Sequence, residues 1–290
     1  MSAEERGQLS SGPAERPEHH HRDGGARLLR VLVCFKAVPE LEALTGSDWQ
    51  PDDRFQVDVR FAKTVINPLD ESALEMSLKL RDQAEKSGLI AHLTALTIGD
   101  GKADSILKTL YALKFNRVVR IENDVDLRFN PEQVAAYIHA FVSGPDHFDL
   151  VVMGGRSADG DNGRVPLLLA EALDWPCLTQ VTDFKLKGDC LEVANLIDDG
   201  ELVQIVRPPV ILAVGNAPAT YLRVPTLKDK MSHGKREIER PTPSENAVSP
   251  AYELRLLRYE QHERDAVIIE GSTPAEKAER LYYDYLKDRL

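Results

Sequence analysis

The sequence predicts an α/β fold in which a parallel β-sheet lies between two layers of helices, followed by an extended C-terminal arm. Short apolar runs alternate with amphipathic helical segments from about residue 28 to residue 175, and this alternation is typical of parallel sheets. After residue 178 the pattern changes to strands joined by tight turns. From residue 226 periodicity is weak and prolines are frequent. We therefore expect a disordered tail at 1–27, an α/β domain at 28–225 and an arm at 226–290.

The first strand is expected in "LLRVLVCFKAV" and the first helix after Asn67 and Pro68. Proline is tolerated at a first helical position, and the acidic Asp70 and Glu71 suit the positive end of a helix dipole. The apolar residues that follow fall on one helical face, namely Leu69, Ala73, Met76, Leu80 and Ala84.

Later elements follow the same alternation. Strands are expected in "AHLTALTIG", "RVVRIEN" and "FDLVVMGG", and helices in "ADSILKTLYALKFN", "NPEQVAAYIHAFVSG" and "VPLLLAEAL". The stretch from "LTQV" to "ILAVG" contains the turns "KGD" and "DDG", which predicts antiparallel hairpins. Near the C-terminus, Thr273 and Pro274 are a suitable N-cap and first residue for a final amphipathic helix.

Composition excludes several classes of function. The net charge is −11, and an acidic chain repels the phosphates of nucleic acids, so a nucleic-acid partner is not expected. The three cysteines, Cys34, Cys177 and Cys190, form no CxxC pattern, which argues against a disulfide framework or a zinc site and fits the reducing cytoplasm. No run approaches the ~18 apolar residues of a membrane span.

The N-terminal 27 residues are polar and lack the apolar core of a secretory signal. Their content of proline, glycine and serine predicts disorder. The run His19–His21 is interpreted as part of this solvated tail and not as a metal site, because nothing nearby in the sequence would order one.

The loop in "GGRSADGDNGRVPLLLAEALDWP" (Gly154–Pro176) is the most unusual stretch of the chain. Its glycines allow close approach of the backbone to a ligand, and the helix that follows offers free amides and a positive dipole end to a phosphate. Arg156 and Arg164 add positive charge, while Asp159 and Asp161 could accept hydrogen bonds from a ribose or hold a metal. The spacing matches neither GxGxxG nor the P-loop. The sequence favours a nucleotide-type phosphate held by backbone, and an ordinary surface loop is the alternative.

Catalytic residues are not indicated. No Ser-His-Asp arrangement can be identified, and surface or core positions are expected for His139 and His147 rather than catalytic ones. A chain that holds a nucleotide without acid–base groups would be a carrier or a regulator.

Four motifs, in this order, resemble those of the electron transfer flavoprotein β (small) subunit family. They are "LRVLVCFKAVPE", "INPLDESALEMSLKLRD", the "GGRSADGDNGRVPLLLAEALDWP" loop and "RVPTLKDKMSHGKREI". Each motif alone is weak, but four in the right order are strong, and the similarity runs from about Leu29 to Leu290. The resemblance implies a flavodoxin-like or adenine nucleotide alpha hydrolase-like domain and a heterodimer with a larger α subunit, which the C-terminal arm wraps.

The resemblance also implies cofactors and partners. In this family the α subunit carries the redox-active FAD, and the β subunit holds either AMP or, in electron-bifurcating members, a second FAD that takes hydride from NADH. Acyl-CoA or other flavin dehydrogenases dock on the β subunit. Carried over to this chain, the docking leucine is Leu227. The implied nucleotide-site residues are Cys34, Asn67, Pro68, Leu69, Asp70, Ile98, Ser157, Ala158, Asp159, Gly160, Asp161, Asn162, Gly163, Arg164, Val165, Pro166, Leu167 and Leu168.

The chain departs from the family pattern at two positions of the loop. Arg164 stands where the family has glutamine, and Pro166 stands where it has glycine. Proline removes one amide donor, and Arg164 could replace it with charge. "DGD" and "NPLDE" resemble the bifurcating branch more than the AMP-only branch, so the sequence leans slightly towards FAD.

Two other hypotheses remain open on the sequence alone. A stand-alone nucleotide-binding regulator similar to universal stress proteins would share the strand–helix pattern and a glycine-rich loop, but it has no use for residues 226–290. A structural subunit that has lost its nucleotide is the other alternative, because of Arg164 and Pro166.

Overall fold

The computed structural model describes residues 22–23, 26–53, 57–218, 220–233, 235–242 and 266–288. The chain divides into two compact units, Met1–Tyr252 and Glu253–Leu290. Residues 1–21 of the expected tail, with the histidine run, lie outside the described residues. A two-residue strand, β1 (Arg22–Asp23), pairs antiparallel with the start of β2 (Ala26–Cys34).

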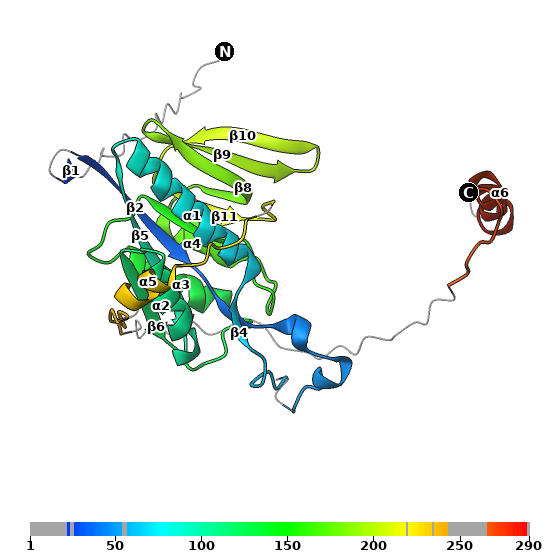
Figure 1. Cartoon of the computed structure of the whole chain (residues 1–290), viewed down its shortest axis with the longest axis horizontal. Helices are drawn as coiled ribbons and strands as arrows, with labels where there is room; N and C mark the ends of the chain where they lie inside the picture. Colours follow the sequence, from blue (N-terminus) through cyan, green and yellow to red (C-terminus); the bar gives the residue numbers. More distant parts are fainter. Residues whose placement is uncertain are drawn as a thin grey trace, which may run out of the picture. The chain divides into compact units, whose positions relative to one another are not determined.

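The larger unit is built on one long sheet (Figure 1). Among the described residues its strand order is β10-β9-β8-β11-β7-β2-β5-β6, with β1 beside β2. The strands joined in parallel are β2, β5 (Ile90–Gly99), β6 (Arg117–Glu122), β7 (Leu150–Gly154), β11 (Val210–Val214) and β8 (Cys177–Lys187). The antiparallel extension at one end consists of β9 (Cys190–Ile197) and β10 (Gly200–Val206).

One strand differs from the expectation. The sequence placed "VILAV" among the antiparallel hairpins, but β11 runs parallel between β7 and β8. All five residues of β11 are buried, and a short, fully apolar strand is typical of the centre of a parallel sheet. The hairpin prediction is correct only for β8, β9 and β10.

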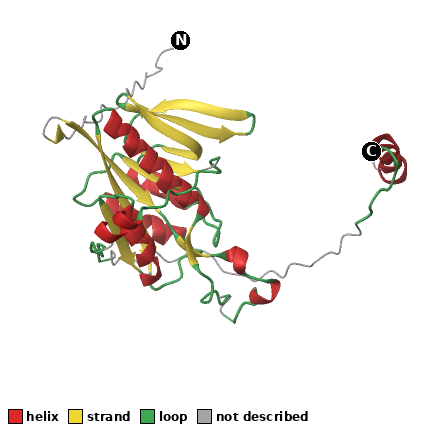
Figure 2. Ribbon diagram, in the orientation of Figure 1, coloured by secondary structure: helices red, strands yellow, loops and turns green. Residues whose placement is uncertain are grey.

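Helices cover both faces of the sheet (Figure 2). One face packs against α1 (Pro68–Lys86) and α2 (Asp104–Ala112). The other packs against α3 (Pro131–Val142) and α4 (Val165–Leu173). The predicted three-layer α/β fold is confirmed.

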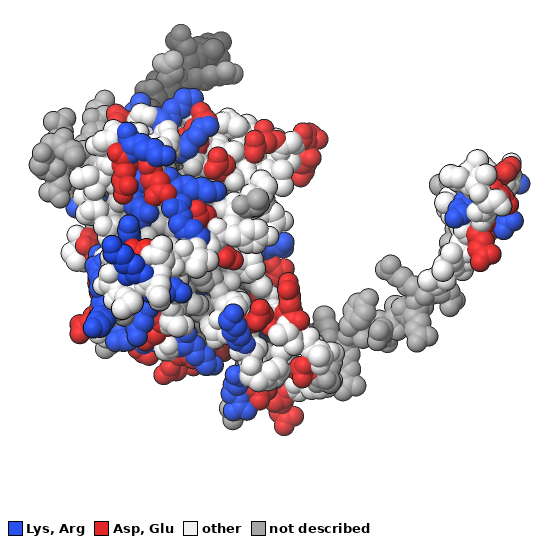
Figure 3. Space-filling model, in the orientation of Figure 1, with Lys and Arg blue, Asp and Glu red and all other residues white. Residues whose placement is uncertain are grey.

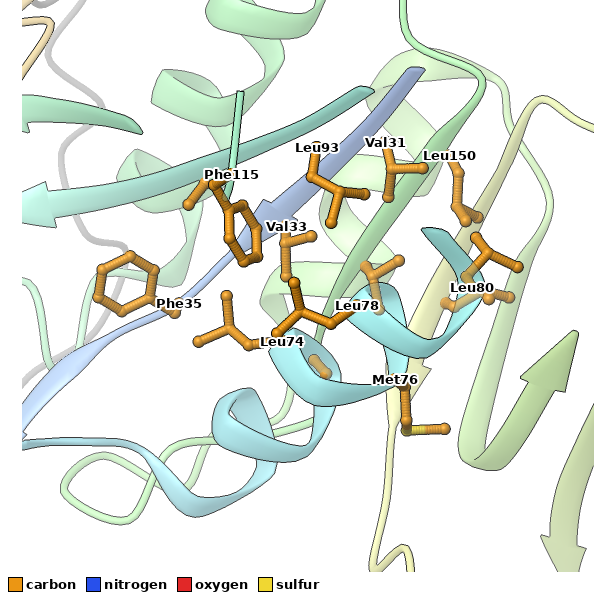
Figure 4. Close-up of a cluster of buried hydrophobic side chains, with 14 of the residues drawn as sticks. Val31, Val33, Phe35, Leu74, Met76, Leu78, Leu80, Leu93, Phe115 and Leu150 are labelled. Atoms are coloured by element: carbon orange, nitrogen blue, oxygen red, sulfur yellow. The ribbon is translucent and has the colours of Figure 1, made fainter. Parts of the chain in front are cut away.

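Strand alternation divides the core into two layers. Val31 and Val33 of β2 belong to the cluster on the α1 side, where Figure 4 shows them with Leu74 of α1. Leu32 and Cys34, the intervening residues, belong to the cluster on the α3 and α4 side. Successive side chains of a strand point to opposite faces, so β2 contributes to both layers and is buried throughout its second half.

The strand order reverses beside β2. The chain moves from β2 to β5 and β6 on one side, then returns through α3 to β7 on the other side. The loops after β2 and β7 therefore diverge at the carboxyl ends of neighbouring strands. Such a switch point opens a crevice, and it is where ligands of open α/β sheets bind.

A small ribbon projects from this end of the sheet. It consists of β3 (Ala37–Pro39) paired antiparallel with β4 (Thr64–Ile66). Short 3₁₀ turns occur at Leu41–Ala43, Gly46–Asp48 and, after β5, Gly101–Ala103.

Residues beyond the expected domain end at 225 still contact the α/β domain. Helix α5 (Leu227–His233) packs against α2, and Ile238 is buried in the core. Glu239 pairs with β6 through its backbone, accepting from the N–H of Arg120 at 2.9 Å and donating to the carbonyl of Val118 at 3.1 Å. This segment therefore covers the β6 edge of the sheet.

The described part of the smaller unit is a single helical segment. Thr273 accepts a hydrogen bond from the N–H of Glu276, as expected for an N-cap, and α6 (Pro274–Leu281) continues into a π-helical turn at Tyr282–Leu286. None of the described residues 266–288 is buried. Among the helices that the structure describes, none combines the length and apolar content needed to cross a bilayer.

Candidate functional site

A cavity lies at the switch point, between the carboxyl ends of β2, β5 and β7 and the first turns of α3 and α4. Its volume of about 130 Å³ is roughly ten times the ~10–15 Å³ that one water molecule needs. The apolar part of its wall comes from Leu96, Ile98, Val134, Ile138 and Met153. The loop after β7 and the charged residues Lys36, Arg128, Arg156 and Arg164 form the polar part. An apolar interior beside a polar loop suits a base joined to phosphate.

Half of the nucleotide-site residues that the family resemblance implies line this cavity. They are Cys34, Asp70, Ile98, Ser157, Asn162, Gly163, Arg164, Val165 and Pro166. The others, which do not form its wall, are Asn67, Pro68, Leu69, Ala158, Asp159, Gly160, Asp161, Leu167 and Leu168. Several residues of this second group fix the loop in place.

Asn67 holds the start of the loop. Its side chain is 2% exposed, donates to the carbonyl of Arg156 at 2.9 Å and accepts from the N–H of Ala158 at 3.0 Å. Asn67 precedes the proline that begins α1, so the N-terminal end of α1 is tied directly to the loop after β7. The Asn-Pro pair therefore serves loop geometry as well as helix initiation.

Asp70 ties together the ends of β2 and β7. One carboxylate oxygen accepts from the N–H of Lys36 at 2.9 Å, and the other accepts from the N–H of Gly154 at 2.6 Å. Burial raises the pKa of Asp70 to about 6, although both N–H donors favour the charged form. A Cβ at Gly154 would lie 2.5 Å from the Asp70 carboxylate, so only glycine allows this close contact.

The loop itself requires unusual backbone. Gly163 and Asp161 have φ of +62° and +44°, a region that glycine adopts at no steric cost and aspartate tolerates. A Cβ at Gly160 would come within 2.7 Å of the carbonyl oxygen of Arg128. The glycines are thus explained by turn geometry and by close packing on the loop that precedes α3.

Each of four basic side chains around the cavity is paired with a carboxylate. The pairs are Lys36–Asp159 at 2.8 Å, Arg128–Asp126 at 2.8 Å, Arg164–Glu132 at 2.7 Å and Arg156–Asp161 at 3.4 Å. Arg164 therefore links the first turn of α4 to the first turn of α3. The carboxylates offset the positive charge, so phosphate affinity would depend on backbone amides and on how readily these pairs exchange partners.

Two residues of the cavity wall, Lys36 and Arg128, were not predicted from the sequence. Arg128 lies in the loop after β6, which also supplies Leu127 and leads into α3. That loop also joins a strand end to a helix start, and "FNPEQ" resembles the Asn-Pro start of the first helix. The rule that ligands of open α/β sheets bind at the carboxyl ends of strands would have identified this loop.

Acid–base, nucleophilic and metal chemistry find little support at this site. Burial raises the pKa of the Cys34 thiol, with a smaller effect of Asp70, so this cysteine stays protonated and unreactive. His139 lies near the Oγ of Ser143 at 3.3 Å, on α3 away from the cavity wall. Within the described residues, no group of three or more histidine, cysteine or acidic side chains could hold a metal ion.

A second cavity, of about 360 Å³, adjoins the first and shares Ile98 with it. Its wall is formed by the β3–β4 ribbon and by the loops after β5 and β6. Its lining includes the charged residues Arg60, Asp100, Lys102 and Asp126. A ligand longer than a mononucleotide could extend from one cavity into the other.

Leu227, the docking leucine that the resemblance implies, belongs to a group of four exposed apolar side chains. We call this group the docking segment, and each of its members is more than 70% exposed: Tyr221, Val224, Leu227 and Met231. Arg223 fixes its base. The Arg223 guanidinium binds the carboxylate of Glu75 on α1 at 2.8 Å and that of Asp82 at 2.6 Å. The Glu71 and Ser72 side chains also bind the backbone of residues 220–222.

Comparison of this sequence with known proteins gives a consistent result. A family model described as the electron transfer flavoprotein domain matches residues 57–246. A protein of Escherichia coli (strain K12) named as an electron transfer flavoprotein subunit, YgcR, is 36% identical over 265 residues, covering 90% of this chain and 99% of the relative. The electron transfer flavoprotein subunit beta of Bacillus subtilis (strain 168) is 30% identical over 182 residues, covering 61% and 67% of the two chains. The acryloyl-CoA reductase electron transfer subunit gamma of Anaerotignum propionicum is 28% identical over 207 residues, covering 70% and 73%.

Proposed function

The chain belongs to the electron transfer flavoprotein β-subunit family, and from this premise we propose that it holds an adenine nucleotide at the switch-point cavity and forms the smaller subunit of a heterodimer. The observation that carries the proposal is the cavity itself, with an apolar interior beside a glycine-rich loop that Asn67 and Asp70 hold in place. The family match extends past residue 225 to residue 246, which favours this proposal over a stand-alone regulator.

The cavity suggests how the nucleotide lies. The adenine ring would occupy the apolar part between Ile98, Ile138 and Met153. The phosphates would meet the loop and the positive end of α4, where Pro166 removes one amide donor. The paired Arg164 could turn from Glu132 to a phosphate oxygen, replacing that donor with a charge-assisted hydrogen bond.

We favour FAD over AMP in this site. AMP would fill the first cavity alone, whereas the second half of FAD needs further space, and the second cavity beyond Ile98 offers it. A flavin bound there would supply the hydride and electron chemistry, with NADH as the donor in a bifurcating protein. The residues of this chain would bind the cofactor, orient it and exclude water.

Two kinds of protein partner follow from this proposal. The α subunit carries the other FAD, and the helix at 274–286, with no buried residue of its own, supports an arm that packs on that subunit. An acyl-CoA or other flavin dehydrogenase would dock at the docking segment, in keeping with a relative named as an acryloyl-CoA reductase subunit. The three free cysteines fit a cytoplasmic location.

The decisive experiment measures bound nucleotides. We would co-express the full chain with a candidate α subunit, purify the complex and quantify the FAD and AMP released on denaturation. Two FAD per heterodimer are expected. One FAD with one AMP would contradict the assignment of FAD to this site, and one FAD with no second nucleotide would support the subunit with a lost nucleotide.

A further inference from the structure

Two cationic side chains lie where the two cavities meet. In the chain that follows β2, Lys36 lines the first cavity and Ala37 lines the second. In the loop that follows β6, Arg128 lines the first cavity and Asp126 lines the second. We call the place bounded by Lys36 and Arg128 the passage. A ligand that occupied both cavities would have to run through it.

A buried carboxylate lies close to both cations. The side chain of Asp159 is 7% exposed and binds the Nζ of Lys36 at 2.8 Å. The pKa of Arg128 is raised, mainly by its hydrogen bonds to Asp126 and to a smaller extent by the charge of Asp159. The carboxylates of the other three pairs around the first cavity are 26% to 62% exposed. Because an unpaired buried carboxylate is costly, the Lys36–Asp159 pair is the one least suited to come apart.

The Lys36 ammonium can bind an anion without leaving Asp159. It carries three N–H donors, and in the described part of the chain one of them goes to Asp159. Its side chain is 34% exposed and lines the first cavity. Arg128, by contrast, already binds both carboxylate oxygens of Asp126. Lys36 is therefore the better placed donor for an anion in the passage.

The chemistry of the nucleotides indicates which anion this is. AMP has one phosphate, which the loop after β7 and the positive end of α4 would bind. FAD has a second phosphate, and its diphosphate stands in the middle of the molecule, between the adenosine and the flavin half. A ligand with its adenosine in the first cavity and its other half in the second would therefore bring the second phosphate to the passage.

The overall charge of the chain does not favour a second phosphate. The net charge is −11, and Figure 3 shows acidic and basic side chains close together over much of the face that it draws. An acidic molecule repels phosphates at long range. A second phosphate therefore adds affinity only where a cation is fixed in the site, and Asp159 fixes Lys36 in this way.

We propose that Lys36, positioned at the passage by Asp159, binds the second phosphate of the nucleotide and makes the site prefer a nucleoside diphosphate ligand over AMP. The inference rests on the proposed function, because it deepens the assignment of an adenine nucleotide to the first cavity. Lys36 determines the specificity, and Asp159 is a positioning residue that acts through Lys36.

The test compares ADP with AMP, which differ only in the second phosphate. The full-length chain, freed of nucleotide, would be titrated with each by calorimetry. The ratio of the two Kd values cancels damage to the loop that affects both ligands. Lys36→Met should lower the preference for ADP about tenfold, and Lys36→Arg, which keeps the charge, should retain most of it. An unchanged ratio in Lys36→Met would overturn the proposal.

A matched control separates the site from the net charge. Lys79→Met removes the same charge from an exposed position of α1, and the ratio should change less than twofold. An equal loss of preference in Lys79→Met and Lys36→Met would mean that the net charge of the chain, and not Lys36, sets the ratio.

A double variant keeps the test decisive if Lys36→Met disturbs the fold, because that change leaves Asp159 buried without its cation. Lys36→Met combined with Asp159→Asn removes both charges and should lower the preference for ADP to the same extent. Nucleotide content gives an independent measurement. In complex with a candidate α subunit, the wild type should retain two FAD and the double variant one FAD. Two FAD in both complexes would contradict the role of Lys36.

The outcomes separate this inference from the proposed function. A wild-type chain that binds neither AMP nor ADP, and adds no nucleotide to the complex with the α subunit, would contradict both. A wild-type chain that binds AMP and ADP equally tightly would contradict only the role of Lys36.

Discussion

The loop after β7 and the segment after β11 leave the sheet at the same edge, but they are held in different ways. The first part of the loop is fixed by two buried polar side chains at the start of α1, Asn67 and Asp70, which bind the backbone of Gly154, Arg156 and Ala158. The segment is fixed at its base, where Arg223 binds Glu75, and again where α5 packs on α2 and Glu239 pairs with β6, but Val224 and Leu227 remain 83% and 75% exposed. Holding the loop backbone with buried polar side chains suits a small ligand, which needs preformed geometry. Anchoring the segment while its apolar side chains stay exposed suits their presentation to a large partner.

The largest effect is expected from Arg223→Ala. This change leaves the carboxylate of Glu75, whose side chain is 7% exposed, without its cation. Breaking a buried ion pair from one side costs about 3–5 kcal/mol, and because Arg223 is partly exposed we expect about 3 kcal/mol of unfolding free energy to be lost in urea titrations. Arg223→Lys keeps the charge but not the two-pronged contact, so its loss should be intermediate. Unchanged stability in both variants would mean that the base of the segment is not anchored by this pair.

Asn67→Ala should have the next largest effect, on the loop. It removes the partners of the Ala158 N–H and the Arg156 carbonyl, and each lost hydrogen bond costs about 0.5–1.5 kcal/mol. We expect about 2 kcal/mol of lost stability and about tenfold faster nucleotide release, followed by gel filtration and chromatography of the retained nucleotide. Asn67→Asp preserves the acceptor for Ala158 and should lose less. A variant that keeps its nucleotide as wild type does would contradict the role of Asn67 in the site.

Sequence patterns predicted the alternating part of the fold because each element there satisfies a local rule. The Asn67–Pro68 helix start and the Thr273 cap appear where those rules place them. The position of β11 could not be predicted in this way, because "VILAV" has no local feature that distinguishes a parallel central strand from an antiparallel one. Its neighbours β7 and β8 are specified only by the packing of the whole sheet.

The Asp70→Asn variant tests how Asp70 holds the loop, through the pH dependence of the unfolding free energy. Because burial raises the pKa of Asp70 from 3.8 to about 6, the folded chain holds this proton more tightly than the unfolded chain. The resulting stability is fully present below about pH 4 and is lost as the pH rises to about 6, by on the order of 1 kcal/mol per pH unit. The difference in unfolding free energy between wild type and Asp70→Asn isolates this group from other carboxylates. We expect that difference to change across this window, and a constant difference would show that Asp70 titrates normally.

Only part of the candidate site could be predicted from the sequence, for a similar reason. Glycine-rich sequence and helix starts identified the loop after β7, and nine of the eighteen proposed nucleotide-site residues line the cavity. Lys36 and Arg128 were missed because their proximity depends on which strands are neighbours, and that is a property of the sheet. Pairing of Arg164 with Glu132 was equally hidden, since it joins two helices whose starts meet only in the folded chain.

The smallest effect on stability, and the sharpest test of the docking segment, is expected from Leu227→Ala. Its side chain is 75% exposed, so the unfolding free energy should change by less than about 0.5 kcal/mol. Electron transfer with the dehydrogenase should nevertheless slow about fivefold or more, because an exposed leucine that enters a partner's pocket contributes about 1 kcal/mol or more to binding. Stopped-flow measurement of flavin reduction would show this, with flavin content unchanged.

Ile90→Ala, at an exposed apolar residue at the amino end of β5, serves as the control and should leave the rate as in wild type. Equal rates for Leu227→Ala and Ile90→Ala would remove the docking role, and the contrast between a loop built to hold a ligand and a segment built to meet a partner would lose its second half.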